Sequence, residues 1–388
     1  ALGYSNHNWT LPEPSAASYT QELIDNAKSF SDTAMVVISR VGGEMADLPT
    51  NMDGLNYTEN STEYNDFEPG QHYLSLTKTE KNMIDMVTKN FANVVLVYNG
   101  ANTLEMGFVN DYPQIKSVIW CPGTGQTGFN ALGEIVAGEV NPSGHSADTF
   151  VYDLTAAPYF NNIGDFAYTN ADSVGYTVAS QAGGDAKLVP PHFVNYVEGI
   201  YVGYKFYETA ADEGLIDYDK EVVYPFGYGL SYTTFTQKMS DITNDGADLK
   251  FSVTVTNTGS VAGKDVVEIY SDPPYTNGGI EKASANLLDF AKTSELAPGE
   301  SETIDFTIPV EDLASYDYKN NGCYVLEAGD YIISTNSDSH NVLDSKTYTV
   351  ASDIVYNESN KRGSDEVVAT NQFDFAAVSY THLRAHET

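Results

Sequence analysis

The chain has 388 residues and is long enough for two domains with full cores or for three small ones. Apolar residues make up 41% of it and charged residues 19%. Its 19 basic residues stand against 54 acidic residues, which leaves a net charge of −35. A surface of this sign repels nucleic acids and anionic membranes, which excludes both as expected partners, and no apolar run approaches the roughly 20 residues of a membrane helix.

Residues 15–140 alternate between helical and strand patterns. Thr77 is a helix N-cap, and Glu80, three residues later, completes a capping box. The apolar strand patterns are residues 34–39, 93–99 and 114–121, and the helical patterns are residues 15–30, 77–91 and 126–139. Strands separated by helices predict an α/β three-layer sandwich with a mainly parallel sheet. Sites in such sheets form at the carboxyl ends of the strands, so the loops after Ser39, Tyr98 and Cys121 are the places to search.

Residues 145–222 show no regular pattern and are rich in Tyr, Asn, Asp and Gly. A long stretch of this kind predicts a functional loop or an excursion that packs on a neighbouring domain. The segment 224–235, YPFGYGLSYTTF, then combines five aromatic residues with a proline and two glycines. Pro225 fixes its own φ, while Gly227 and Gly229 allow close backbone approaches, so the segment predicts a rigid aromatic turn between two domains.

After Phe235 the apolar residues alternate with polar ones. The strand patterns lie at residues 249–257, 265–271, 302–309 and 330–336, and the turn sequences NDG, NTG, APGE and EAGD separate such strands. Several short antiparallel strands over roughly 115 residues predict an all-β sandwich.

The first strand pattern leads into RVGGEMADLP, residues 40–49. Gly42 and Gly43 allow the chain to turn sharply at the carboxyl end of the strand, and Glu44 is then presented above the sheet. On spacing alone, a Glu after two glycines is more often a solvated loop carboxylate than a catalytic one.

These segments, in their order along the chain, resemble glycoside hydrolase family 3. YPFGYGLSYTTF is similar to the signature that closes the α/β sandwich domain of that family, and the β-rich region after it resembles the fibronectin type III-like domain that follows there. The segments NPSG (141–144) and YVEGIYVGYKFYETA (196–210) also match in family order. In family β-glucosidases of this layout a strand ends in a Gly-Glu-x-x-Asp loop, which falls here on Gly43, Glu44 and Asp47.

The resemblance implies a retaining exo-acting β-glycosidase, first of all a β-glucosidase that removes terminal β-D-glucosyl residues from short oligosaccharides or β-glucosides. Glu44 would be its general acid/base. A retaining enzyme also needs a nucleophilic carboxylate roughly 5 Å away. In the family this is an Asp on a (β/α)₈ barrel, in a Ser-Asp-Trp-like motif, and this sequence has neither that motif nor the Lys-His pair of the barrel. We therefore expect the barrel to be a missing partner and this fragment to be inactive alone.

Four further residues are candidates for the site. The resemblance suggests that Arg40 and Asp47 support the Glu44 loop or contact substrate, while Trp120 and Tyr228 could line a subsite or simply pack in a core. Where the family often has Arg, the chain has Leu48 after Asp47 and His145 after NPSG, so the substrate stays open. The alternatives are a β-xylosidase of the same family and a non-catalytic carbohydrate-binding or adhesion module.

Neither a metal nor a cofactor is expected. Cys121 and Cys323 fall in different expected domains, and neither they nor the histidines show ligand spacing. The expected organisation is an α/β domain over residues 1–230, incomplete at its N-terminus, a fibronectin type III-like domain over 231–350, a linker over 351–377 and a non-native tail over 378–388. The linker resembles the one that leads into the barrel in domain-permuted family members. The oligomeric state and the location stay open, whether bacterial cytoplasm or secretion or surface anchoring through a segment not present here.

Overall fold

The computed structural model describes residues 14–42, 48–53, 66–162, 176–178, 187–189, 193–194 and 196–370. The chain forms two compact units. The first comprises Ala1–Ala137, Thr149–Gly199 and Asp219–Tyr224, and the second comprises Gly138–Asp148, Ile200–Tyr218 and Pro225–Thr388. Within the described ranges, no helix has the length and apolar character needed to cross a membrane.

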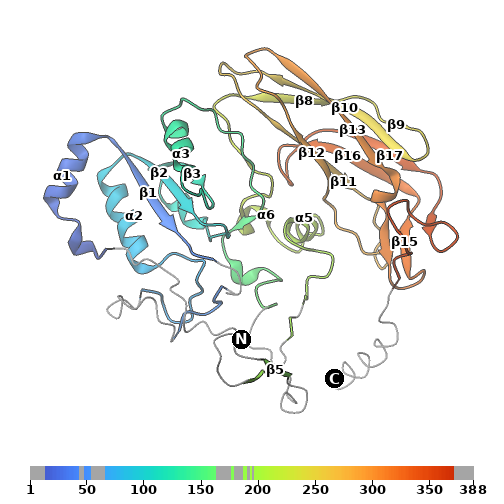
Figure 1. The fold of residues 1–388 in the computed structure, drawn as a ribbon, viewed down its shortest axis with the longest axis horizontal. Coiled ribbons are helices and arrows are strands. Elements are labelled where there is room, and N and C mark those ends of the chain that lie inside the picture. The colour runs from blue at the N-terminus through green and yellow to red at the C-terminus, as the bar shows by residue number, and fades with distance from the viewer. Residues whose placement is uncertain are drawn as a thin grey trace. The chain divides into compact units, whose positions relative to one another are not determined.

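A three-stranded parallel sheet forms the centre of the first unit (Figure 1). Its order is β1-β2-β3, with β1 at Thr33–Ser39, β2 at Asn93–Asn99 and β3 at Ile115–Trp120. Leu96 in the central strand lies between Val36 and Val118, so aliphatic residues meet across the sheet in register. The predicted strands are confirmed, and each limit agrees to within one residue.

The longer helices of this unit are α1 (Gln21–Phe30), α2 (Lys78–Asn90) and α3 (Phe129–Val136). The predicted capping box is confirmed, because Thr77 Oγ1 accepts from the Glu80 N–H at 3.2 Å and Glu80 Oε2 accepts from the Thr77 N–H at 2.9 Å. The prediction of one helix over residues 15–30 is wrong. A short 3₁₀ turn comes first, and α1 begins only after Thr20, whose side chain accepts from the Leu23 N–H.

The core of the first unit joins α2 to one face of the sheet. Ile84 of α2 packs in a single buried cluster with Val36, Ile38, Leu96 and Tyr98. Burial of each large apolar side chain contributes roughly 1.5–3 kcal/mol. Short elements complete the unit, namely η2 (Ala16–Ser18), η3 (Gly107–Asp111), β4 (Phe150–Val151), η4 (Leu154–Ala156), β5 (Tyr176–Val178), β6 (Lys187–Val189) and β7 (Val222–Tyr224).

The second unit is built mainly from antiparallel sheets. One sheet has the order β13-β10-β8 with β9 on β10, a second has the order β12-β11-β16-β17, and a small third one has the order β14-β15-β18. Along β10 every second residue is buried, and the four apolar ones, Leu249, Phe251, Val253 and Val255, share one core cluster with residues of β11 and β16. The elements are α5 (Tyr204–Asp212), β8 (Phe235–Met239), β9 (Thr243–Asn244), β10 (Asp248–Asn257), β11 (Val266–Asp272), β12 (Asn286–Lys292), β13 (Ser301–Pro309), η5 (Val310–Leu313), β14 (Ser315–Asp317), β15 (Cys323–Leu326), β16 (Gly329–Asn336), β17 (Val342–Val350) and β18 (Ile354–Tyr356).

The prediction that residues 145–222 lack regular structure is wrong in part. Helix α5 lies in this stretch, as does the short α6 (Tyr218–Glu221), and β4 pairs with β7. Tyr207, Glu208 and Ala210 are the buried residues of α5. This i, i+1, i+3 spacing is a helical pattern, but the many Tyr and Asp residues around it obscured the signal.

Candidate active site

The loop that carries Glu44 begins where β1 ends. Glu44 and Asp47 belong to residues 43–47, which lie outside the described residues. Both stems of the loop are described, however, as Arg40–Gly42 on the entry side and residues 48–53 on the exit side. The contacts of the two stems therefore define how the loop is anchored.

Arg40, the first residue after β1, is 4% exposed and holds the entry stem. Its guanidinium forms a bidentate pair with Glu80, at 2.5 Å for Nη1–Oε1 and 2.8 Å for Nη2–Oε2. It also donates to three backbone carbonyls, those of Ser39 (2.8 Å), Tyr73 (2.9 Å) and Ser75 (2.6 Å). An arginine has five N–H groups, and here each one has an acceptor inside the protein. No donor is left over for a substrate.

The exit stem is held by the segment that precedes α2. The Met52 N–H donates to the Gln71 carbonyl at 2.8 Å. Met52, Phe67 and Tyr73 form a small buried cluster, against which Leu48 packs. Leu48 stands where the family often has an arginine, and its apolar side chain contributes to this cluster instead.

Trp120, at the end of β3, faces the interior of the first unit. Its indole N–H donates to the Gly100 carbonyl at 2.7 Å, and its ring lies edge-on to Phe150 at 5.1 Å between centroids. Asn99 Nδ2 in turn donates to the Cys121 carbonyl at 2.8 Å. The loops after β2 and β3 are thus tied together at the same edge of the sheet from which the Glu44 loop leaves.

Tyr228 belongs to the second unit, whereas Arg40 and Trp120 belong to the first. Its backbone exchanges hydrogen bonds with Ser146, since the Ser146 N–H donates to the Tyr228 carbonyl at 2.9 Å and the Tyr228 N–H donates to Ser146 Oγ at 3.1 Å. Burial raises the pKa of the Tyr228 phenol, with a smaller effect from Asp338. The aromatic signature is thereby fixed to the residues that follow NPSG.

Gly227, next to Tyr228, has φ +82°, and a Cβ on it would lie 2.3 Å from Glu268 Oε2. This position therefore requires glycine for two reasons, its backbone conformation and its close approach to a buried carboxylate. Glu268 is 5% exposed and accepts from the Tyr270 hydroxyl at 2.8 Å.

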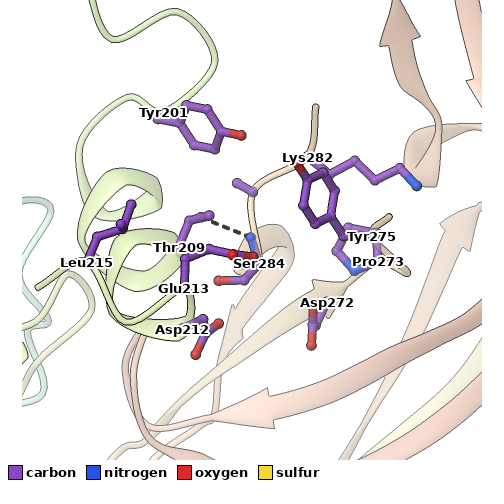
Figure 2. Close-up of a pocket in the computed structure, with 11 residues that line it drawn as sticks. Tyr201, Thr209, Asp212, Glu213, Leu215, Asp272, Pro273, Tyr275, Lys282 and Ser284 are labelled. Atoms are coloured by element: carbon purple, nitrogen blue, oxygen red, sulfur yellow. Dashed lines mark hydrogen bonds between the residues drawn. The ribbon is translucent and has the colours of Figure 1, made fainter. Parts of the chain in front are cut away.

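A pocket of about 580 Å³ opens on the second unit (Figure 2). Asp212 of α5 and Asp272 at the end of β11 both line it. Asp272 is exposed, but desolvation by the surrounding protein and, to a smaller extent, the neighbouring Asp212 raise its pKa to about 6. Lys282 is neutralised internally, at 2.5 Å from Glu327 Oε2 and from the Pro274 carbonyl. Over the described ranges, no three His, Cys, Asp or Glu side chains are grouped so that they could hold a metal ion.

Comparison with known proteins first defines the class. Residues 13–204 match the glycosyl hydrolase family 3 C-terminal domain, and residues 265–339 match the fibronectin type III-like domain. An α/β domain with a parallel sheet followed by an antiparallel β region is the predicted fold class, which is confirmed. The chain belongs to glycoside hydrolase family 3.

Several relatives are β-glucosidases by name. The chain is 31% identical to β-glucosidase A of Butyrivibrio fibrisolvens, over 88% of this chain and 40% of that protein, and 31% identical to a β-glucosidase of Ruminococcus albus, over 90% of this chain and 31% of that protein. Among solved structures, a β-glucosidase from Paenibacillus barengoltzii matches at 31% identity with a TM-score of 0.71, covering 91% of this chain and 34% of that one. β-Glucosidase 3B from Thermotoga neapolitana, in complex with α-D-glucose, matches at 28% identity and 0.69, covering 89% and 41%. The chain therefore spans well under half the length of these relatives.

Proposed function

We propose that the chain is part of a retaining, exo-acting β-glucosidase in which Glu44 is the general acid/base. The observation that carries the proposal is the anchoring of the Glu44 loop, whose two stems are held by buried contacts at the carboxyl edge of a parallel sheet. The Gly-Glu-x-x-Asp sequence lies between these stems, and relatives that align along most of this chain are named β-glucosidases.

In the proposed reaction Glu44 first donates its proton to the glycosidic oxygen as that bond breaks. The sugar is then held as a covalent ester on a nucleophilic carboxylate, and the ionised Glu44 removes a proton from the water that hydrolyses this ester. The nucleophile would be an Asp on a (β/α)₈ barrel outside this chain. That arrangement agrees with the limited share of each relative that the chain spans.

The proposed roles of the other residues follow from their contacts. Arg40 is a support of the loop rather than a sugar ligand, because all its donors are used internally. Asp47 would hold the loop through backbone hydrogen bonds. Trp120 positions neighbouring loops, and Tyr228 remains the candidate for lining a sugar subsite. The expected domain limits at residues 230, 350 and 377 are proposed with this function.

The test uses the complete protein encoded by the parent gene and a series of aryl β-glucosides. Glu44→Ala should slow substrates with poor leaving groups roughly 10²- to 10⁴-fold and activated aryl glucosides far less, because only the former need protonation. Added azide should restore turnover with a glycosyl azide as product. Glu134→Ala, which removes an exposed carboxylate on α3, is the matched control and should behave like the unmodified enzyme. Equal losses on every substrate would reject the acid/base role.

A second experiment addresses the alternatives with the 388-residue chain alone. We expect no hydrolysis of aryl β-glucosides and no saturable binding of glucose or cellobiose, since half of the site would be absent. Tight binding by the isolated chain would favour a carbohydrate-binding module. A higher kcat/KM for xylosides than for glucosides in the complete protein would favour a β-xylosidase.

A further inference from the structure

We propose that Tyr73 is the positioning residue of the Glu44 loop. Its hydroxyl accepts a hydrogen bond from the Val41 N–H at 2.8 Å, on the entry stem. Its own backbone N–H donates to the Pro49 carbonyl at 3.1 Å, on the exit stem. One residue thus binds both ends of the segment that contains Glu44. The inference deepens the proposed function and rests on it.

Tyr73 is itself fixed on every side. The side chain is fully buried, and its ring lies beside that of Phe67, at 6.4 Å between centroids. The Arg40 guanidinium lies over the Tyr73 ring at 5.5 Å, within the range of a cation–π interaction, and Arg40 Nε donates to the Tyr73 carbonyl. Burial raises the pKa of the Tyr73 phenol, so the hydroxyl stays protonated over the range in which proteins are assayed.

The contacts that hold Tyr73 also extend to the first turn of α2. Arg40 connects Tyr73 to Glu80, and Glu80 closes the capping box with Thr77. The loop stems, the Tyr73 segment and the helix N-terminus therefore form one buried hydrogen-bonded network. A movement of the entry stem has to break a contact to Tyr73 or to Glu80.

Such anchoring of the loop matters for an acid/base residue because proton transfer requires heavy atoms at hydrogen-bond distance. A displacement of about 1 Å can lower a rate by roughly 10²-fold. The residue that acts on the substrate would be Glu44, while Tyr73 acts through the stems. Replacement of Tyr73 by Phe keeps the ring, the apolar packing and the bond to Pro49, and removes the hydroxyl that accepts from Val41.

The first test measures amide hydrogen exchange on the 388-residue chain. In the unmodified protein the Val41 amide should exchange as slowly as the amides of β1, and rapid exchange there would overturn the inference without any variant. In Tyr73→Phe the amides of residues 41–48 should exchange roughly tenfold faster. Tyr112→Phe removes a tyrosine hydroxyl bonded to Asp85 on α2, so as the matched control it should leave this segment unchanged.

The second test uses the complete enzyme and separates the inference from the proposed function. Tyr73→Phe should lower kcat for glucosides with poor leaving groups by roughly 10- to 100-fold, with KM nearly unchanged and activated aryl glucosides affected less. If Glu44→Ala shows the leaving-group dependence but Tyr73→Phe does not, the positioning role is wrong and the acid/base assignment stands. If Glu44→Ala lacks that dependence, the proposed function fails, and the role of Tyr73 in positioning an acid/base residue fails with it. The hydrogen-exchange measurement then tests by itself whether Tyr73 holds the two stems of the loop.

Discussion

Breaking the buried pair of Arg40 and Glu80 should destabilise the first unit strongly. The two side chains are only 1% and 6% exposed. Glu80→Gln retains an acceptor for the Thr77 N–H but leaves the guanidinium buried without a counter-charge. Removal of one partner of such a pair costs about 3–5 kcal/mol, which is a large part of the 5–15 kcal/mol that typically holds a domain together. For a unit of this size that loss corresponds to a decrease in Tm of roughly 6–20 °C.

The assay is urea unfolding followed by tryptophan fluorescence, since both tryptophans of the chain belong to the first unit. Lys78→Met is the matched control, because the pair of Lys78 with Glu68 spans 3.3 Å but is 43% and 65% exposed, and it should cost less than about 1 kcal/mol. The double variant Arg40→Met/Glu80→Gln should lose less than the sum of the single variants. Additive losses, or a Glu80→Gln variant as stable as the control, would refute the idea of a buried, mutually dependent pair.

Three further predictions concern other parts of the chain. The folded-state pKa of Asp272 is raised to about 6, so its contribution to stability is lost as pH rises from about 4 to 6. Asp272→Asn should therefore stabilise the protein at pH 7.5 by roughly 1 kcal/mol, after allowance for solvent screening, and leave its stability unchanged at pH 4. Thermal melts at both pH values measure this, and an equal shift in Tm at the two pH values would contradict the prediction. Gly227→Ala should cost about 2 kcal/mol or more in urea unfolding, because its Cβ would meet Glu268, and an unchanged midpoint would show that the turn can relax. Trp120→Phe should cost about 1 kcal/mol through the lost indole hydrogen bond and alter kcat equally for all leaving groups, whereas a selective loss would place Trp120 at the reaction centre.

The sequence predicts the parallel sheet and the α2 capping box because both depend on neighbours close along the chain. A capping box needs residues three positions apart, and an apolar strand can be recognised from six or seven consecutive residues. Arg40 could be identified as a loop residue in the same way. Its partner Glu80 was visible only as a helix cap, because nothing local indicates that one carboxylate serves both purposes.

Tyr73 had no sequence signal of its own. Its contacts reach residues 24 and 32 positions away, and the segment that contains it indicates only the helix that follows. The pairing of Glu208 with His340, across 132 positions, is invisible for the same reason. Contacts of this kind depend on which distant segments the tertiary fold brings together, and hydrophobic periodicity carries no information about that.

Under the proposed function there is a physical reason for the many buried contacts of the two stems of the Glu44 loop. In a retaining site assembled from two domains, the acid/base must already be in place when the domain with the nucleophile closes against it, because only a correctly spaced pair of carboxylates can act. The chain has 19 basic residues against 54 acidic ones, yet it buries Arg40 at the entry stem of this loop with every donor used. The buried charge holds the stems, while Glu44 lies between them. Changes at the stems should consequently reduce stability and rate together, whereas a change at Glu44 should reduce the rate alone.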